Sequence, residues 1–281
     1  MRARPVVLSL LLVAVTAAML WRGWGFYQLG LDQRVDHPDF RALRPSGSYG
    51  IGLGYLGTLL ILANLLYLAR RKHIIRLGDM RTWLDFHVFS GLLAAILAVF
   101  HAAFQLRTPV AQATVLSLAI VVVTGMVGRW LHAFTARLTL HAMPEAAREL
   151  DERVPPLGRH IAAAVAAFPP TQLPANASLL RCLGTMPRWH AEARARREAV
   201  GLVAEAHPIW GQLDRRERRS LRRLVAEARR AASADVRSVA TTALLRSWRS
   251  LHRMFALLML LAVVVHVGMA WHYGYHWIFG S

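Results

Sequence analysis

Cysteine, lysine and acidic residues are scarce in this chain of 281 residues. Cys182 is the only cysteine, and Lys72 is the only lysine among 34 basic residues, which stand against 16 acidic ones. A single cysteine excludes a disulfide framework, a CxxC zinc or redox site, covalent haem attachment through CxxCH and a cysteine-bound iron–sulfur cluster. Any metal cofactor held by this chain must therefore use histidine, of which there are 13.

The composition is apolar and strongly basic. Hydrophobic residues make up 55% of the chain, and the formal net charge is +18. This combination is typical of a membrane protein with a polar part, whose basic charge lies against anionic lipid and on the cytoplasmic side. We expect contact with membrane lipid and no nucleic acid.

Five apolar segments predict an all-α fold, a bundle of five transmembrane helices. They cover residues 6–21, 49–69, 83–106, 113–134 and 252–272. The first segment follows a basic start and suits either a cleaved signal peptide or an anchor. The continuation Met19-Leu20-Trp21 and the lack of an A-x-A site favour an uncleaved anchor.

A polar insertion separates the fourth and fifth segments. Residues 135–250 hold 20 arginines against 11 acidic residues, and no nucleotide-binding motif occurs there. Apolar residues three and four apart predict helices over 188–205 and 214–230, with Asp214 as a candidate cap. A last helix from about Ser233 is expected to continue into the fifth segment. We therefore expect three parts: transmembrane helices 1–4 (1–134), a mostly helical insertion (135–250), and helix 5 with a short tail (251–281).

Arginine and lysine counts predict the orientation. The 70–81 loop carries five basic residues, the insertion carries twenty arginines, and Arg2 and Arg4 precede the first segment. The positive-inside rule puts the N-terminus, this loop and the insertion in the cytoplasm and the C-terminus outside. We expect an integral protein of a bacterial inner membrane.

Two histidine pairs, each fourteen residues apart, lie on the third and fifth segments: His87 with His101, and His252 with His266. On a helix this spacing advances the chain by about 21 Å and falls about 40° short of four turns, so both histidines face one side. The two segments run in the same direction, so His87 matches His252 in depth and His101 matches His266. Neutral imidazole is a common metal ligand, and this arrangement predicts two haem b groups, each held by two histidines.

Glycines and arginines near the histidine pairs are further candidates for contact with haem. Gly91, one turn after His87, would let a flat porphyrin approach, and Arg129 and Arg253 would pair with haem propionates; helix packing and lipid phosphate are the alternatives. Further candidates of these two kinds are Gly125, Gly128, Gly268, Arg81 and Arg249. The remaining histidines near the membrane margins, which suit proton handling, a quinone site or the lipid interface, are His132, His272 and His276.

The segments Trp83-Leu84-Asp85-Phe86-His87 through His101, and Trp248-Arg249-Ser250-Leu251-His252 through His266, resemble the di-haem b-type cytochromes. These are the cytochrome b subunit of quinol–cytochrome c reductases and the ferric-reductase-like transmembrane proteins that include NADPH oxidases. The resemblance covers under a third of the chain and implies two bis-histidine haems. The PEWY-type quinol motif is absent, and we expect no flavin and nicotinamide domain after Gly274.

The function expected from these features is a di-haem subunit that carries electrons across the membrane. A quinone is one expected partner, and a subunit with iron–sulfur, flavin or c-type haem centres is the other. The alternative is a haem-free membrane scaffold or assembly subunit that docks a cytoplasmic partner through its arginine-rich insertion. A histidine-lined transporter is disfavoured, because Asp85 is the only acidic residue near the apolar cores.

Overall fold

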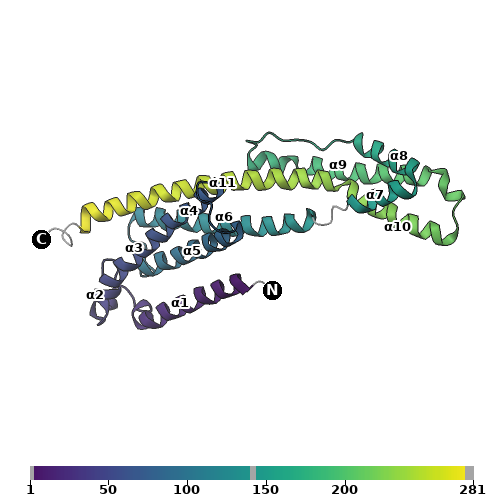
Figure 1. Cartoon of the computed structure of the whole chain (residues 1–281). Helices are drawn as coiled ribbons and strands as arrows, with labels where there is room; N and C mark the ends of the chain where they lie inside the picture. Colours follow the sequence, from purple (N-terminus) through teal and green to yellow (C-terminus); the bar gives the residue numbers. More distant parts are fainter. Residues whose placement is uncertain (1–2, 140–143, 276–281) are drawn as a thin grey trace. The chain divides into compact units, whose positions relative to one another are not determined.

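The computed structural model describes residues 3–139 and 144–275, and these ranges contain helices and turns but no strand (Figure 1). The all-α class is thereby confirmed. The helices are α1 (Ala3–Tyr27), α2 (Phe40–Leu43), α3 (Ser48–Ala63), α4 (Leu65–Arg71), α5 (Met80–His101), α6 (Pro109–Thr139), α7 (Pro144–Arg153), α8 (Pro155–Ala166), α9 (Leu179–Ala206), α10 (Arg215–Ala232) and α11 (Ala234–Ala270). The short turns are η1 (Gln33–Asp36), η2 (Pro208–Gly211) and the π-helical η3 (Trp271–Tyr275).

In the described part of the chain, five helical stretches are long and apolar enough to cross a membrane. They lie within residues 4–27, 40–71, 80–101, 109–133 and 215–273. Large apolar side chains such as Leu10, Leu116 and Leu257 are exposed on these helices. Exposed apolar surface of this extent suits contact with lipid rather than water. The protein is therefore an integral membrane protein.

The chain divides into two compact units. One unit, called the membrane unit here, comprises Met1–Gly125 and His252–Ser281, and the other, called the helical unit, comprises Met126–Leu251. Helix α6 continues through the first boundary and helix α11 through the second. The helical unit begins nine residues before the polar insertion that was predicted at 135–250. All four candidate haem ligands belong to the membrane unit.

Four helices share the core of the membrane unit. Buried side chains of α3, α5, α6 and α11 pack together there: Ile61, Ala94, Leu118, Met259 and Val263. Gly57 of α3 brings two helices close, because a Cβ on it would lie 3.7 Å from the Ala94 carbonyl oxygen and the Leu97 Cβ of α5. Small residues permit such close packing in membranes. The histidine-bearing helix α5 is thereby fixed against α3.

Two of the predicted membrane helices differ in detail from the structure. The segment predicted as one helix over 49–69 is interrupted at Asn64, whose Oδ1 lies 2.9 Å from the Ser90 Oγ of α5. The third segment ends as a helix at His101 rather than at 106, because Ala103 (φ +48°) and Phe104 (φ +60°) adopt the left-handed conformation. Apolar composition alone indicates neither the interruption at Asn64 nor the helix end at His101.

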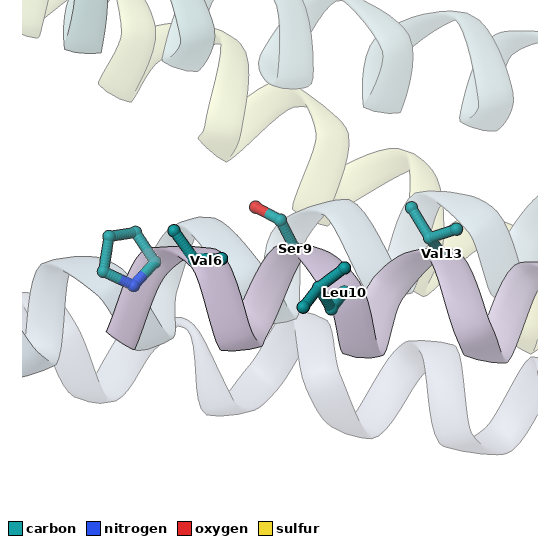
Figure 2. A pocket seen from close by; sticks show the side chains of 5 residues that line it. Val6, Ser9, Leu10 and Val13 are labelled. Carbon is teal, nitrogen blue, oxygen red and sulfur yellow. The ribbon is translucent and has the colours of Figure 1, made fainter. Parts of the chain in front are cut away.

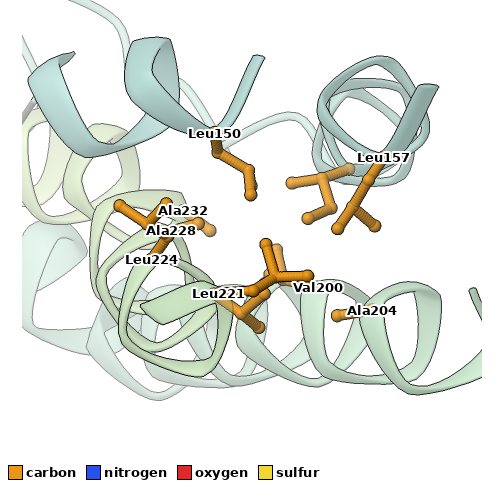
Figure 3. Close-up of a cluster of buried hydrophobic side chains, with 10 residues drawn as sticks. Leu150, Leu157, Val200, Ala204, Leu221, Leu224, Ala228 and Ala232 are labelled. Atoms are coloured by element: carbon orange, nitrogen blue, oxygen red, sulfur yellow. The ribbon is translucent and has the colours of Figure 1, made fainter. Parts of the chain in front are cut away.

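The helical unit has a core of its own, which contains buried residues of α7, α8, α9 and α10 (Figure 3). Asp214 caps α10 as predicted and forms a capping box with Glu217. Helix α9 begins nine residues before the predicted 188, at Leu179, because Ser178 caps it and the helix continues through Pro187. Helix α11 begins at Ala234 and continues without a break into the membrane unit, which confirms the prediction for the last helix.

Candidate functional site

His101, the last residue of α5, is held by α3. Its Nδ1 lies 2.8 Å from the carbonyl oxygen of Gly50. A carbonyl only accepts hydrogen bonds, so Nδ1 must carry the proton and Nε2 keeps its lone pair. One turn further along α3, a Cβ on Gly54 would lie 3.0 Å from the His101 Cε1 and Nδ1 atoms. Helix α3 thus orients the ring and leaves Nε2 in the form that binds a metal.

His252 of α11 is held in the same manner by α6. Its Nδ1 lies 3.0 Å from the Thr124 Oγ1, and that hydroxyl lies 2.8 Å from the Ile120 carbonyl oxygen. A hydroxyl that donates to a carbonyl accepts from its other neighbour, so Nδ1 of His252 carries the proton and Nε2 is again the metal-binding nitrogen. A Cβ on the adjacent Gly125 would lie 3.3 Å from the His252 Cε1.

The rings of His101 on α5 and His266 on α11 lie beside one another within the membrane unit. Their ring centroids are 6.2 Å apart and their planes are nearly perpendicular, at 88°. An imidazole nitrogen lies roughly 2 Å from a bound metal and the ring centre about 1 Å beyond, so two imidazoles on opposite sides of one metal have centroids about 6 Å apart. The spacing of this pair fits an iron held between two histidines.

His87 is placed differently. Its ring stacks on Tyr67 of α4, with centroids 4.8 Å apart and planes 30° from parallel. Its Nδ1 is buried and has no hydrogen-bond partner within the described ranges. His87 and His252 are near enough to interact electrostatically. The unpaired Nδ1 of His87 indicates a ligand or a water beside this ring. The pairing of His87 with His252 on one haem stays a prediction.

A cavity of about 780 Å³ adjoins the His101–His266 pair. Both histidines line it, and we call it the His101 cavity. Most of its wall is apolar. About half of the lining residues come from α3, α5, α6 and α11, with Val115, Val263 and Ala270 among them, and most of the others come from the loops after α1 and α5. Its volume lies within the range of roughly 300–1,000 Å³ that holds small ligands and cofactors.

The same cavity has a cationic part and no acidic residue. Arg34, Arg44 and Arg107 line it, and none of its lining residues is Asp or Glu. The guanidinium of Arg34 donates to the carbonyl oxygens of Tyr27, Leu29 and Ala103 at 2.8–2.9 Å. Burial lowers the pKa of Arg34, yet an arginine stays protonated in proteins. The cavity thus combines an apolar body, two imidazoles and positive charge.

A second depression is lined almost entirely by apolar side chains. Figure 2 shows this shallow depression of about 340 Å³, in which all the lining residues belong to the first part of α1. Apart from Ser9 they are apolar, and Leu10 and Val13 are exposed. The depression contains no titratable side chain and belongs to the apolar exposed surface of α1.

The other predicted site residues lie elsewhere. A Cβ on Gly91 would lie 3.6 Å from the Asn64 Nδ2, so this glycine faces the interruption between α3 and α4. Arg129 and Arg253 are exposed and are not among the residues that line the His101 cavity. Nothing within 4 Å would meet a Cβ on Gly268. Their roles toward haem stay predictions, and His276 lies outside the described residues.

Sequence reasoning missed the residues that orient the histidines. Gly50, Gly54 and Thr124 touch the candidate ligands, and Arg34 and Arg44 line the cavity. The glycines of α3 recur at positions 50, 52, 54 and 57, and that density within an apolar helix was an available signal. Arg34 and Arg44 lie in the loop after α1, where the sequence offers no periodicity.

No protein-family model, curated protein or solved structure matches the chain. A haem at the His101–His266 pair is compatible with the residues present. The described residues include no group of three His, Cys, Asp or Glu side chains that could hold a metal ion. A haem requires only two axial ligands from the protein, because its porphyrin supplies the others.

Proposed function

We propose that this protein is a di-haem b-type cytochrome subunit that carries electrons across the membrane. His101 and His266 would hold one haem, and His87 and His252 would hold the other. The observation that carries the proposal is the His101–His266 pair, 6.2 Å apart beside a cavity of about 780 Å³. Bound haem would supply a one-electron carrier near each margin of the bilayer.

The protein's own contribution is to fix the ligand nitrogens. The Gly50 carbonyl and the Thr124 hydroxyl each accept from an Nδ1 and leave Nε2 free to bind iron. Such outer hydrogen bonds hold the ring orientation and raise the basicity of the ligand. One histidine of each pair is thus oriented before any cofactor binds, which lowers the entropic cost of ligation.

The proposal includes partners and a location. With only Cys182 and no flavin motif, the chain needs an electron donor and acceptor, which we propose are a quinone and a redox subunit with iron–sulfur, flavin or c-type haem centres. The location is a bacterial inner membrane, with the N-terminus and the 135–250 insertion in the cytoplasm and the C-terminus outside.

A second candidate function is a haem-free scaffold. The observation in its favour is the exposed basic surface of α10, which carries Arg215, Arg216, Arg219, Arg222 and Arg223. An acidic protein surface would complement it electrostatically. The same surface suits docking of a redox subunit, so it does not distinguish the two functions.

The deciding experiment is a reduced-minus-oxidised visible spectrum of the purified full chain, with the haem quantified as the pyridine haemochrome. We expect two b-type haems per chain. His101→Ala or His266→Ala should remove one haem and leave the other, while His132→Ala, a matched change at an exposed histidine of α6, should remove neither. A folded protein without haem, or one that keeps both haems in all these variants, would overturn the proposal.

A further inference from the structure

Arg44 carries a buried polar atom without a partner beside the His101 cavity. It follows the short helix α2, and its guanidinium lies over the Phe40 ring, 5.5 Å from the centroid. Its Nε is buried and has no hydrogen-bond partner in the part of the chain that the structure describes. Leaving a buried donor of a charged group unsatisfied is costly, so such an atom indicates an acceptor from a ligand or water.

A tight turn connects Arg44 to the histidine site. The Arg44 carbonyl accepts from the Gly47 N–H at 2.8 Å, and a Cβ on Gly50 would lie only 2.2 Å from the same carbonyl oxygen. The carbonyl of Gly50 is in turn the acceptor of His101 Nδ1. One glycine therefore contacts the backbone of Arg44 and fixes the ring of His101. The backbone of Arg44 and the ring of His101 thus both contact Gly50.

The remaining arginines of the cavity divide by their engagement. Arg34 is 6% exposed, and all three of its guanidinium nitrogens donate to main-chain carbonyls, so its role is to hold backbone segments together. Arg107 is exposed, and its Nε donates to the Gln105 side chain at 3.1 Å. Arg44 and Arg107 thus remain as the groups whose charge is available to a ligand.

From these contacts we infer that the ligand of the His101 cavity carries carboxylate groups and that Arg44 and Arg107 bind them. The inference rests on the proposed function and deepens it: the ligand is a porphyrin with free propionates, oriented with its acidic edge toward the loops that carry these arginines. A guanidinium presents paired N–H donors that match a carboxylate, and no acidic residue of the cavity wall competes for them.

The test compares two forms of the cofactor on a chain with one histidine pair. His252→Ala removes the other pair, and the full-length, haem-depleted protein in detergent is titrated with ferric protoporphyrin IX and with its dimethyl ester. The free acid should bind at least about tenfold more tightly, because esterification removes the negative charge. This comparison needs no change at either arginine, so misfolding of an arginine variant cannot obscure it.

Arginine variants then assign the contact. Arg44→Leu and Arg107→Leu should each reduce the preference for the free acid, and Arg44→Lys should retain part of it. Arg41→Leu is the matched control, because this exposed arginine of α2 lies three residues away and does not line the cavity. Circular dichroism and size-exclusion chromatography check the fold of each variant.

The outcomes separate the two proposals. Equal affinity for acid and ester, or an unchanged preference in both Arg→Leu variants, would overturn the carboxylate inference while the bis-histidine spectrum stands. If the parent chain and the His252→Ala chain both fold but take up neither porphyrin, the proposed function fails, and the inference fails with it.

Discussion

The Nδ1 of His252 lies 3.0 Å from the Oγ1 of Thr124 on the neighbouring helix. Thr124 is buried, and its hydroxyl is also within 2.8 Å of the Ile120 carbonyl. The hydroxyl donates along its own helix and accepts from the histidine, so one threonine determines which nitrogen of His252 is protonated. Helix α6 thus orients the His252 ring through Thr124.

Replacing Thr124 by valine should loosen His252 without removing the ligand. The change keeps the branched shape and deletes the acceptor of Nδ1–H. The variant should still bind haem, with an altered midpoint potential. Its affinity for haem should fall about 10–100-fold, as metal affinity does when other hydrogen-bonding partners of metal ligands are removed. Redox titration monitored in the visible spectrum measures the first effect and haem titration the second. Thr124→Ser should restore both, and a Thr124→Val protein with unaltered potential and affinity would contradict the role given to this hydroxyl.

Gly52 and Gly54 of α3 allow a matched test of the His101–His266 pair. A Cβ on Gly54 would lie 3.0 Å from the His101 ring, whereas nothing within 4 Å would meet a Cβ on Gly52. Gly54→Ala should displace the His101 ring, with a cost of about 1–3 kcal/mol for the overpacked contact. We expect weaker haem uptake and a changed spectrum in Gly54→Ala, with neither change in Gly52→Ala. Equal behaviour of the two variants would show that the ring tolerates the methyl group.

The fold could be predicted from the sequence where composition determines it. Five spans of membrane length and a last helix that continues from about Ser233 through the fifth span both follow from hydropathy and periodicity, and the structure has them. The interruption at Asn64 and the helix end at His101 could not be predicted. Both depend on tertiary contacts, one to Ser90 of another helix and one involving left-handed residues beside Arg34.

The sequence indicated which histidines could form the candidate site but not the residues that orient them, and the role of these histidines as haem ligands stays a prediction. The fourteen-residue spacing on two segments of the same direction matched His101 with His266 in depth, and the structure has their ring centroids 6.2 Å apart. The orienting groups are a main-chain carbonyl of Gly50 and the hydroxyl of Thr124, and neither has a spacing rule relative to the histidine it holds. Their contribution depends on how α3 and α6 pack against α5 and α11, which a single sequence does not specify.

A pH effect is expected in the loop after α1. Arg22 donates to both carboxylate oxygens of Asp39, at 3.0 and 3.2 Å, and this hydrogen bonding holds the pKa of Asp39 below its usual range. A carboxyl whose pKa is lower in the folded state contributes stability above its unfolded pKa, near 3.8, and this contribution is lost as the pH falls through the folded pKa. Thermal unfolding in detergent between pH 3 and pH 6 should show this loss in the parent and less of it in Asp39→Asn. Identical pH profiles of the parent and Asp39→Asn would contradict the contribution of the Arg22–Asp39 pair to stability. The difference in stability should be small because the pair is exposed.

Arg34 should matter for stability more than any exposed arginine of the same loops. Its guanidinium joins the end of α1 to the left-handed turn after His101, through the carbonyl oxygens of Tyr27 and Ala103. Arg34→Leu removes the donor of three carbonyls, and the buried one, of Ala103, costs about 1–3 kcal/mol when left unpaired. Arg41→Leu at an exposed position should change stability by less than about 0.5 kcal/mol. Unfolding of the haem-depleted chain in mixed detergent micelles measures both variants. Since Ala103 follows His101 closely, Arg34→Leu should also weaken haem binding at the His101–His266 pair. Loss of stability with unchanged haem affinity would show that the arginine holds α1 in place without positioning the ligand.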